Sequence, residues 1–225
     1  MAWVAVETFD TYSDGDLNGN NGGSGWAAGW SGDADYDVQG TITYNGSAKA
    51  VSTTGANGTI ARTLTSASSS GVVYVAIRYA VATDDFQVDF ITSGVNKMCR
   101  YGFRNTNDLV VLHSGGVTVL DTAASTTTWY LAEITYNGTT FDIRYHNGTA
   151  WSTPVTGLGY EGGAGDLTIV SLNGGLTQTC YVDYISPTNP IVDSNIKSLD
   201  TNVRANIKSY NTNVLANIKS INTNP

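Results

Sequence analysis

Apolar and polar residues alternate along most of residues 1–187 with a period of two, which is typical of β-strands. Three stripes of alternate apolar positions are the clearest, and they comprise Val73, Val75, Ile77, Tyr79 and Val81; Phe86, Val88 and Phe90; and Phe141, Ile143 and Tyr145. Successive side chains of a strand point to opposite faces, so each stripe directs one face of its strand into a core. Because no helical period of useful length occurs before residue 190, we expect an all-β antiparallel sandwich.

Turn residues separate the predicted strands about every ten positions, which is the spacing found in sandwiches. Asn137-Gly138 lies between two strand-like runs and predicts a hairpin with a type I′ turn, in which both central residues have positive φ. Asn45-Gly46, Asn57-Gly58 and Asn147-Gly148 mark further turns. All four pairs precede Ser or Thr and match the N-glycosylation pattern, but we interpret them as turns because no signal peptide is seen.

A long polar loop rich in Gly and Asn covers residues 14–32. Loops of this length are usually functional or held in place by their own side chains. We expect Trp26 and Trp30 to anchor the loop on the rim of the sandwich, and stacking of these rings on a sugar is the alternative. Residues 14–19 match the D-x-D-x-N-G opening of an EF-hand calcium loop, but the twelfth position is Gly25 instead of Glu. We therefore favour a solvated turn.

An eleven-residue repeat begins at Asn195, with two full copies and the start of a third before Pro225. Its apolar positions lie three or four residues apart, and eleven residues over three turns is the repeat of a right-handed helical coiled coil. The Asn, Ser, Thr, Ile and Val of the repeat are poor helix formers, so a single helix of this length would be marginal. We expect a helical oligomeric stalk, with a trimer favoured; an extended tail that docks elsewhere and a small β-repeat are the alternatives.

Composition and charge narrow the function classes. The 225 residues carry a net charge of −8, and a net-acidic chain without a basic cluster is a poor nucleic-acid binder. With 41% hydrophobic and 10% aromatic residues, the chain can build a core. No run approaches the roughly 18 apolar residues of a membrane span, so we expect neither a membrane partner nor a signal peptide. Cys99 and Cys180 lie in apolar strand patterns and are expected to be buried thiols, and their pairing stays open.

Motifs for catalysis are scarce in the sequence. The three glutamates, Glu7, Glu133 and Glu161, lie in separate segments, so no local pair of carboxylates is available for glycoside hydrolysis. The nucleophile-elbow, zinc-protease and phosphate-loop motifs are absent from the sequence as well. We therefore expect that the protein is not an enzyme, with a polysaccharide-active hydrolase or lyase as the alternative.

Four segments, taken in order, resemble the concanavalin A-like lectin and glucanase jelly roll, a group that includes laminin-G-like modules. They are Glu7-Thr-Phe9-Asp10, Tyr44-Asn-Gly-Ser-Ala-Lys-Ala50, Trp129-Tyr-Leu-Ala-Glu-Ile-Thr-Tyr-Asn-Gly138 and Tyr181-Val-Asp183-Tyr-Ile185. The resemblance covers residues 4–186 and implies two antiparallel sheets, one of them concave, with the first and last strands adjacent. The hydrolases of this group carry E-x-D-x-E on one strand, and that motif is absent here.

The resemblance also implies sites. Many members hold a structural Ca²⁺, and the corresponding ligands here are Glu7, the backbone carbonyl of Gly46, and Asp183. An Asp inside an otherwise apolar strand needs a partner on physical grounds, with an exposed strand position as the alternative. Non-enzymatic members often bind glycans on the concave face. The outward residues that would form this surface are Tyr74, Arg78, Gln87, Asp89, Arg100, Arg104 and Glu133, and a solvated sheet face with ion pairs would have the same composition.

The repeat tail resembles repeats in phage virion and fibre proteins. Together with the predicted jelly roll, it implies a structural or adhesive protein of the virion surface, of capsid-decoration or fibre type, whose head binds cell-surface glycans. Residues 1–187 would form the head, 188–194 a linker and 195–225 the tail, and residues 191–225 would mediate homo-oligomerisation or attachment to other virion proteins. We expect a location on the virion surface or outside the cell, and a stand-alone lectin-like module is the alternative.

Overall fold

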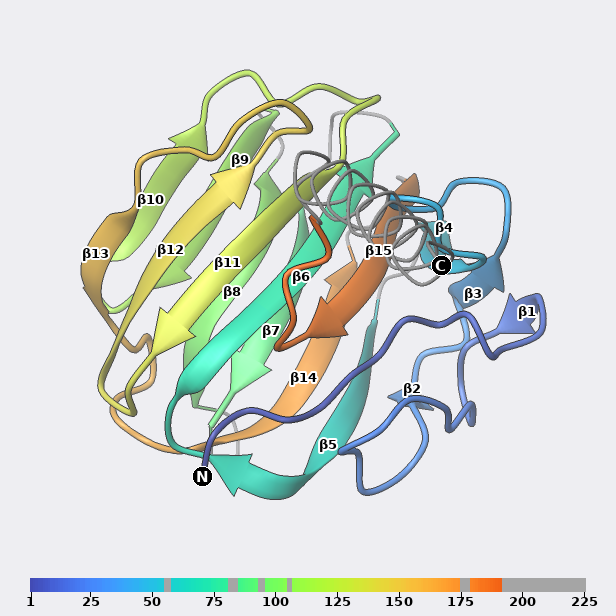
Figure 1. Ribbon diagram of the computed structural model, residues 1–225, viewed down its shortest axis with the longest axis horizontal. Helices are drawn as coiled ribbons and strands as arrows, with labels where there is room; N and C mark the ends of the chain where they lie inside the picture. Colours follow the sequence, from blue (N-terminus) through green and yellow to red (C-terminus); the bar gives the residue numbers. More distant parts are fainter. Residues whose placement is uncertain (55–57, 81–84, 93–95, 105–106, 175–178, 192–225) are drawn as a thin grey trace, which may run out of the picture. The chain divides into compact units, whose positions relative to one another are not determined.

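Two antiparallel β-sheets pack face to face, and Figure 1 shows them as two layers. The computed structural model describes residues 1–54, 58–80, 85–92, 96–104, 107–174 and 179–191. Within them there is no helix, so the prediction of an all-β sandwich is confirmed, and no helix suited to crossing a membrane is found there. The named strands all belong to one compact unit, Met1–Asn189. The repeat over 195–225 lies outside the described residues, so the stalk and the domain division stay predictions.

One sheet contains eight of the described strands and the other contains seven. The order in the eight-stranded sheet is β1 (Gly15–Asp16), β3 (Tyr36–Gln39), β4 (Ala50–Thr54), β15 (Thr179–Ser186), β6 (Gly71–Tyr79), β11 (Tyr130–Tyr136), β12 (Thr140–His146) and β13 (Val155–Gly159). The order in the seven-stranded sheet is β10 (Gly116–Asp121), β9 (Asp108–His113), β8 (Lys97–Arg104), β7 (Phe86–Ile91), β14 (Leu167–Gly174), β5 (Thr59–Ser68) and β2 (Ser31–Gly32).

The two ends of the sandwich domain lie side by side. The backbone N–H of Glu7 donates to the carbonyl of Ile185 at 2.7 Å, and the N–H of Ile185 donates to the carbonyl of Glu7 at 2.8 Å. The first residues of the chain therefore run antiparallel to β15, as the resemblance implies. This pairing brings the start of the chain next to the strand that carries Asp183.

The predicted apolar stripes meet in one core between the sheets. Their buried members are Val73, Val75, Ile77 and Tyr79 of β6; Phe86, Val88 and Phe90 of β7; and Phe141 and Ile143 of β12. Tyr145 is only partly buried, and Val81 lies outside the described residues. Cys99 and Cys180 are both buried, as expected. Because the stripes have period two, the alternate residues of the same strands form the outward faces.

The Asn-Gly turns have two different geometries. The turn at Asn45-Gly46 has φ of +48° and +81°, as a type I′ turn requires, and Ser47 N donates to Tyr44 O at 3.0 Å. At Asn137-Gly138, where we expected that turn, only the glycine has positive φ. The hairpin between β11 and β12 forms nevertheless, because Asn137 Oδ1 accepts the backbone N–H of Thr140 at 3.0 Å and closes the turn from its side chain.

Trp26 and Trp30 anchor the polar loop, which confirms the structural interpretation. Trp26 Nε1 donates to Val6 O at 2.9 Å, and Trp30 Nε1 donates to Glu7 Oε2 at 3.1 Å. Trp30 is 1% exposed, so its ring is not available for stacking on a sugar. The start of the loop forms a turn that is tied to its surroundings, because Asp14 pairs with Lys49 and strand β1 pairs with β3.

Candidate functional site

The seven predicted glycan-binding residues do not form one surface. Tyr74 and Arg78 of β6 and Glu133 of β11 belong to the eight-stranded sheet, whereas Gln87 and Asp89 of β7 and Arg100 and Arg104 of β8 belong to the seven-stranded sheet. Each group lies at the strand positions that alternate with core residues, so each faces outward from its own sheet. The two groups therefore lie on opposite sides of the sandwich.

Asp89 lies at the centre of the outward face of the seven-stranded sheet, opposite Arg100 on β8 and Ser171 on β14. It is only 2% exposed, and Ser171 is 0% exposed, although both positions face away from the core. Gln87 and Asn173 form the next cross-strand pair on β7 and β14. We call these four residues, Gln87, Asp89, Ser171 and Asn173, the polar floor.

Two polar atoms of the floor lack partners. Lys97 Nζ donates to Asp89 Oδ2 at 2.6 Å, so one carboxylate oxygen is paired. Asp89 Oδ1 and Ser171 Oγ are both buried and have no hydrogen-bond partner among the described residues. Buried polar atoms in native proteins are nearly always paired, so each exception needs an explanation such as a water, an ion or a ligand. The floor thus presents two buried oxygens on adjacent strands that a polar group could pair with.

Electrostatics distinguish Asp89 from an ordinary surface carboxylate. Burial raises the pKa of Asp89, while the hydrogen bond and the charge of Lys97 act in the opposite direction. A carboxyl group whose pKa is raised by burial next to a charged partner is typical of functional sites, and structural ion pairs share this signature. The carboxyl can both accept and donate a hydrogen bond in its two protonation states.

A charged rim lies along the β8 side of the floor. Arg100 Nε donates to Glu161 Oε2 at 2.9 Å, and a second contact joins the guanidinium to Glu161 Oε1. The hydrogen bonds from Arg100 lower the pKa of Glu161. Glu161 is positioned by its backbone N–H, which donates to Met98 O of β8 at 3.0 Å. Arg104, farther along β8, lies 3.8 Å from Asp85 in a more exposed ion pair. The rim therefore carries charges of both signs.

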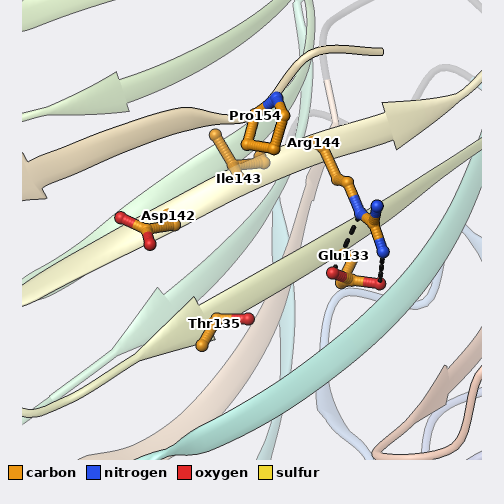
Figure 2. Close-up of a pocket in the computed structure, with 6 residues that line it drawn as sticks. All are labelled: Glu133, Thr135, Asp142, Ile143, Arg144 and Pro154. Carbon is orange, nitrogen blue, oxygen red and sulfur yellow. Dashed lines mark hydrogen bonds and ion pairs between the residues drawn. The ribbon is translucent and has the colours of Figure 1, made fainter. Parts of the chain in front are cut away.

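The outward face of the eight-stranded sheet has a different construction. Arg144 of β12 donates through Nε and Nη2 to the two carboxylate oxygens of Glu133, at 2.9 and 2.8 Å. Tyr74 OH donates to the same carboxylate at 2.9 Å, and burial together with this bond raises the pKa of Tyr74 to about 12. The Arg144 guanidinium also lies 4.5 Å from the ring centre of Trp151. Beside this network is a hollow of about 280 Å³ (Figure 2).

Arg78 does not take part in the Glu133 network. Its Nε donates to Thr126 O at 3.2 Å, and its guanidinium lies 5.9 Å from the ring centre of Tyr181. Trp129 contacts both Tyr181 and Tyr44, with ring centres 6.4 and 5.7 Å apart. The predicted residue Arg78 thus belongs to a separate aromatic cluster on the same sheet.

Sequence reasoning missed Lys97, Ser171, Glu161, Arg144 and Trp151 as members of these two surfaces. A weak signal exists for Ser171, because it interrupts an apolar strand, and for Arg144, because it alternates with the core residues of β12. Lys97 and Glu161 carry no such signal. They reach the floor and the rim only through a strand end and a loop, whose positions depend on the tertiary structure.

The structure removes Glu7 from the predicted calcium site. Its Oε2 accepts from Tyr12 OH at 2.8 Å and from Trp30, and it forms a buried ion pair with Arg62. Its Oε1 accepts the backbone N–H of Phe9 at 2.9 Å. A carboxylate that is neutralised by a guanidinium and whose two oxygens already accept hydrogen bonds is not available as a metal ligand. Glu7 is a core residue that holds the polar loop.

Asp183 fits the calcium prediction only in part. The turn that contains Gly46 contacts it, because Tyr44 N donates to Asp183 Oδ2 at 2.8 Å and Ser47 Oγ donates to the same oxygen. Asp183 Oδ1 is buried without a partner in the described residues, and burial raises the pKa of this carboxyl to about 7. Across the described ranges no group of three His, Cys, Asp or Glu side chains could hold a metal ion. The three predicted residues therefore do not form a coordination set.

Comparisons with known proteins identify the fold and no family. No family model matches the chain, and no curated protein sequence is similar to it. The binding domain of botulinum neurotoxin DC in complex with SialylT matches 87% of this chain and 49% of that chain, with a TM-score of 0.52 and 11% identity. The endo-β-1,4-glucuronan lyase of the fungus Trichoderma reesei matches 79% of this chain and 97% of the lyase, with a TM-score of 0.50 and 12% identity.

A sialidase matches 71% of this chain at a TM-score of 0.50 and 7% identity, and the chain spans only 17% of that protein. The sandwich is thus the jelly roll of lectin-like domains and polysaccharide-active enzymes, as the resemblance implies. The expectation that the chain is not an enzyme is wrong, because a polysaccharide lyase has this fold and aligns with the chain over 97% of the length of the lyase. The absence of one hydrolase motif does not exclude catalysis on a fold that supports several chemistries.

Proposed function

We propose that the chain binds a polysaccharide on the outward face of the seven-stranded sheet, over the polar floor. The observation that carries this proposal is the pair of buried, unpartnered oxygens, Asp89 Oδ1 and Ser171 Oγ, on adjacent strands. A buried polar atom without a partner costs about 1–3 kcal/mol. A sugar hydroxyl both donates and accepts, so one hydroxyl can satisfy the carboxylate oxygen and its neighbour the serine.

Lys97 provides access to the floor. Its ammonium reaches Asp89 from the end of β8 on a flexible four-carbon stem, and its side chain is 23% exposed. Rotation of this side chain would release Asp89 Oδ2 and leave the ammonium free to donate to a ligand oxygen. Arg100 and Glu161 on the rim then provide planar polar groups beside the ligand. The shared fold of a toxin binding domain and a polysaccharide lyase supports the proposal.

Isothermal titration with laminarin, xylan and glucuronan tests this proposal. We expect binding by the native chain and a loss of about tenfold or more in affinity for Ser171→Ala or Asp89→Asn. Thr122→Ala, in an exposed loop, is the matched control and is expected to bind like the native chain. Binding that is unchanged in both floor variants would overturn the assignment of this face.

Cleavage of the bound polymer is a second candidate function. It is favoured by the raised pKa of Asp89 and by the Lys97 ammonium 2.6 Å away, which together supply a proton donor and acceptor on the same face. Each polysaccharide that binds is incubated with the protein, and new reducing ends and unsaturated uronate products are measured. We expect the native protein to form product and Asp89→Asn to form none. If no bound polymer yields product, cleavage is rejected while the binding proposal stands.

The role of the sandwich domain in a virion is a proposal that rests on the eleven-residue repeat alone. We propose that residues 191–225 attach the sandwich to other copies of the chain, or to other proteins of a virion surface, where its glycan-binding face would meet the cell. The eleven-residue period of the tail supports this role. We also propose that a structural calcium ion binds at Asp183. The Oδ1 atom of this carboxylate, which has no hydrogen-bond partner in the described residues, supports this proposal.

A further inference from the structure

We propose that the outward face of the eight-stranded sheet holds a second carbohydrate site, which takes one neutral sugar unit in the hollow over β11 and β12. The ligand class rests on the proposed function, but the site lies on the opposite side of the sandwich from the polar floor. A chain with both sites would be bivalent and would cross-link polymers. The hollow is lined by Glu133, Thr135, Asp142, Ile143, Arg144 and Pro154 (Figure 2).

One side of the hollow is held rigid before any ligand arrives. Arg144 is fixed by two hydrogen bonds to Glu133 and by the ring of Trp151, 4.5 Å from its guanidinium carbon. Tyr74 holds the Glu133 carboxylate from the neighbouring strand at 2.9 Å. Side chains that are already ordered lose little conformational entropy on binding, which is the main advantage of a preorganised site.

The other side of the hollow offers two exposed polar side chains, those of Thr135 and Asp142. Thr135 is exposed, and its hydroxyl makes no hydrogen bond within the described part of the chain. Asp142 is exposed as well, and its Oδ1 accepts Gly157 N at 2.7 Å, which orients the carboxylate. Figure 2 shows Thr135 and Asp142 on one side and the Glu133–Arg144 pair on the other, with Pro154 beside Ile143. A ring placed between them meets donors and acceptors on both sides.

The volume and the net charge of the hollow restrict the class of sugar that can bind there. The volume of about 280 Å³ lies just below the ~300–1,000 Å³ of sites for drug-sized ligands, which suits a single sugar ring of a longer chain. Two carboxylates and one guanidinium leave the lining net negative, so uronates and other anionic sugars are repelled. Hydroxyls of a neutral sugar can donate to Asp142 and accept from Arg144, while the apolar face of the ring packs on Pro154.

Amide chemical-shift mapping of the full chain tests the second site directly. The probes are laminarihexaose, cellohexaose and xylohexaose at millimolar concentration. We expect at least one probe to shift the amides of Thr135 and Arg144 on the one face, as well as those of the polar floor on the other. No shift on β11 and β12 with any of the three probes would overturn the second site.

Two variants separate this inference from the proposed function. Thr135→Trp fills the hollow without breaking a hydrogen bond described in the structure, and we expect it to weaken binding there by about tenfold or more. Thr122→Trp, in an exposed loop, is the matched control and is expected to change nothing. Asp89→Asn is expected to remove the response of the floor while the hollow still responds. If the amides around the hollow still shift on addition of the oligosaccharide in Thr135→Trp, the second site is overturned. If the amides of the polar floor do not shift with any probe, only the proposed function is overturned.

Cross-linking provides a second readout. Mixed with long-chain laminarin or xylan, whichever binds, the native chain is expected to precipitate the polymer, because each molecule engages two chains. Thr135→Trp and Asp89→Asn each keep one of the two sites per chain, and each is expected to precipitate clearly less polymer than the native chain. Precipitation that is undiminished in Thr135→Trp would contradict a bivalent sandwich.

Discussion

Glu7 and Arg62 form an ion pair inside the sandwich, with each side chain only 1% exposed. The guanidinium of Arg62 also donates to Tyr12, Asn21 and the carbonyls of residues 22 and 28. It lies 5.0 Å from the ring centre of Trp26 as well. This one cation therefore ties the start of the chain, the polar loop and strand β5 together.

Replacement of Arg62 is expected to destabilise the fold strongly. Arg62→Met leaves the Glu7 carboxylate buried without its counter-charge, which typically costs about 3–5 kcal/mol. Arg104→Met is the control, because Arg104 pairs with Asp85 at 3.8 Å in an exposed position where such a pair contributes about 1 kcal/mol or less. Urea unfolding followed by tryptophan fluorescence measures both variants.

The double variant Glu7→Gln/Arg62→Met provides the internal check for that pair. Because both charges are removed together, the loss is expected to be clearly smaller than the sum of the two single losses. Additive losses would contradict the assignment of a coupled buried pair.

Asp183 is expected to make stability depend on pH. Burial raises its pKa in the folded protein to about 7, whereas an Asp in the unfolded chain titrates near ~3.9. Between these values the unfolded chain releases the proton and the folded chain keeps it, so this contribution to stability falls as pH rises from about 4 to 7 and is constant above. The loss is on the order of 4 kcal/mol. Asp183→Asn cannot titrate, so its stability relative to the native chain is expected to increase across that window.

Thermal melts at half-unit pH steps, with and without CaCl₂ and EDTA, measure this effect. The difference between the Tm of Asp183→Asn and of the native chain is the quantity of interest, because contributions of other groups cancel in it. A difference that does not change with pH would contradict the raised pKa. A rise in Tm with CaCl₂ that occurs only in the native chain would instead assign a cation to Asp183.

Both cysteines are expected to resist thiol reagents in the folded protein. Cys99 and Cys180 are buried, and burial raises the pKa of Cys99 well above its ordinary value, so little reactive thiolate forms there. Titration with Ellman's reagent is expected to detect no thiol in buffer and both thiols in guanidinium chloride. Detection of none in denaturant without reductant would show that the two cysteines are oxidised.

The repeat tail is expected to set the oligomeric state. Size-exclusion chromatography with light scattering is expected to give a multiple of the 23.8 kDa chain mass for the full chain, with three copies favoured. A chain truncated after Ile191 is expected to be monomeric, with its folding checked by circular dichroism. A monomeric full chain would rule out the stalk.

The sequence by itself determined which residues point inward. Because a strand has a period of two, the stripes Val73–Tyr79 and Phe86–Phe90 could be assigned to a core, and their alternate residues to a surface, without any structure. The neighbouring first and last strands followed from the resemblance alone and are present as the Glu7–Ile185 pairing.

Only the tertiary structure decided which surfaces exist. Asp89 and Glu133 both alternate with core residues, and nothing in that pattern shows that β7 and β11 belong to different sheets. Cross-strand pairing places Ser171 beside Asp89 and Arg144 beside Glu133, over separations of 82 and 11 residues along the printed numbering. Alternation is a local property of the backbone, whereas sheet membership and register depend on long-range hydrogen bonds, and these decide which polar side chains meet.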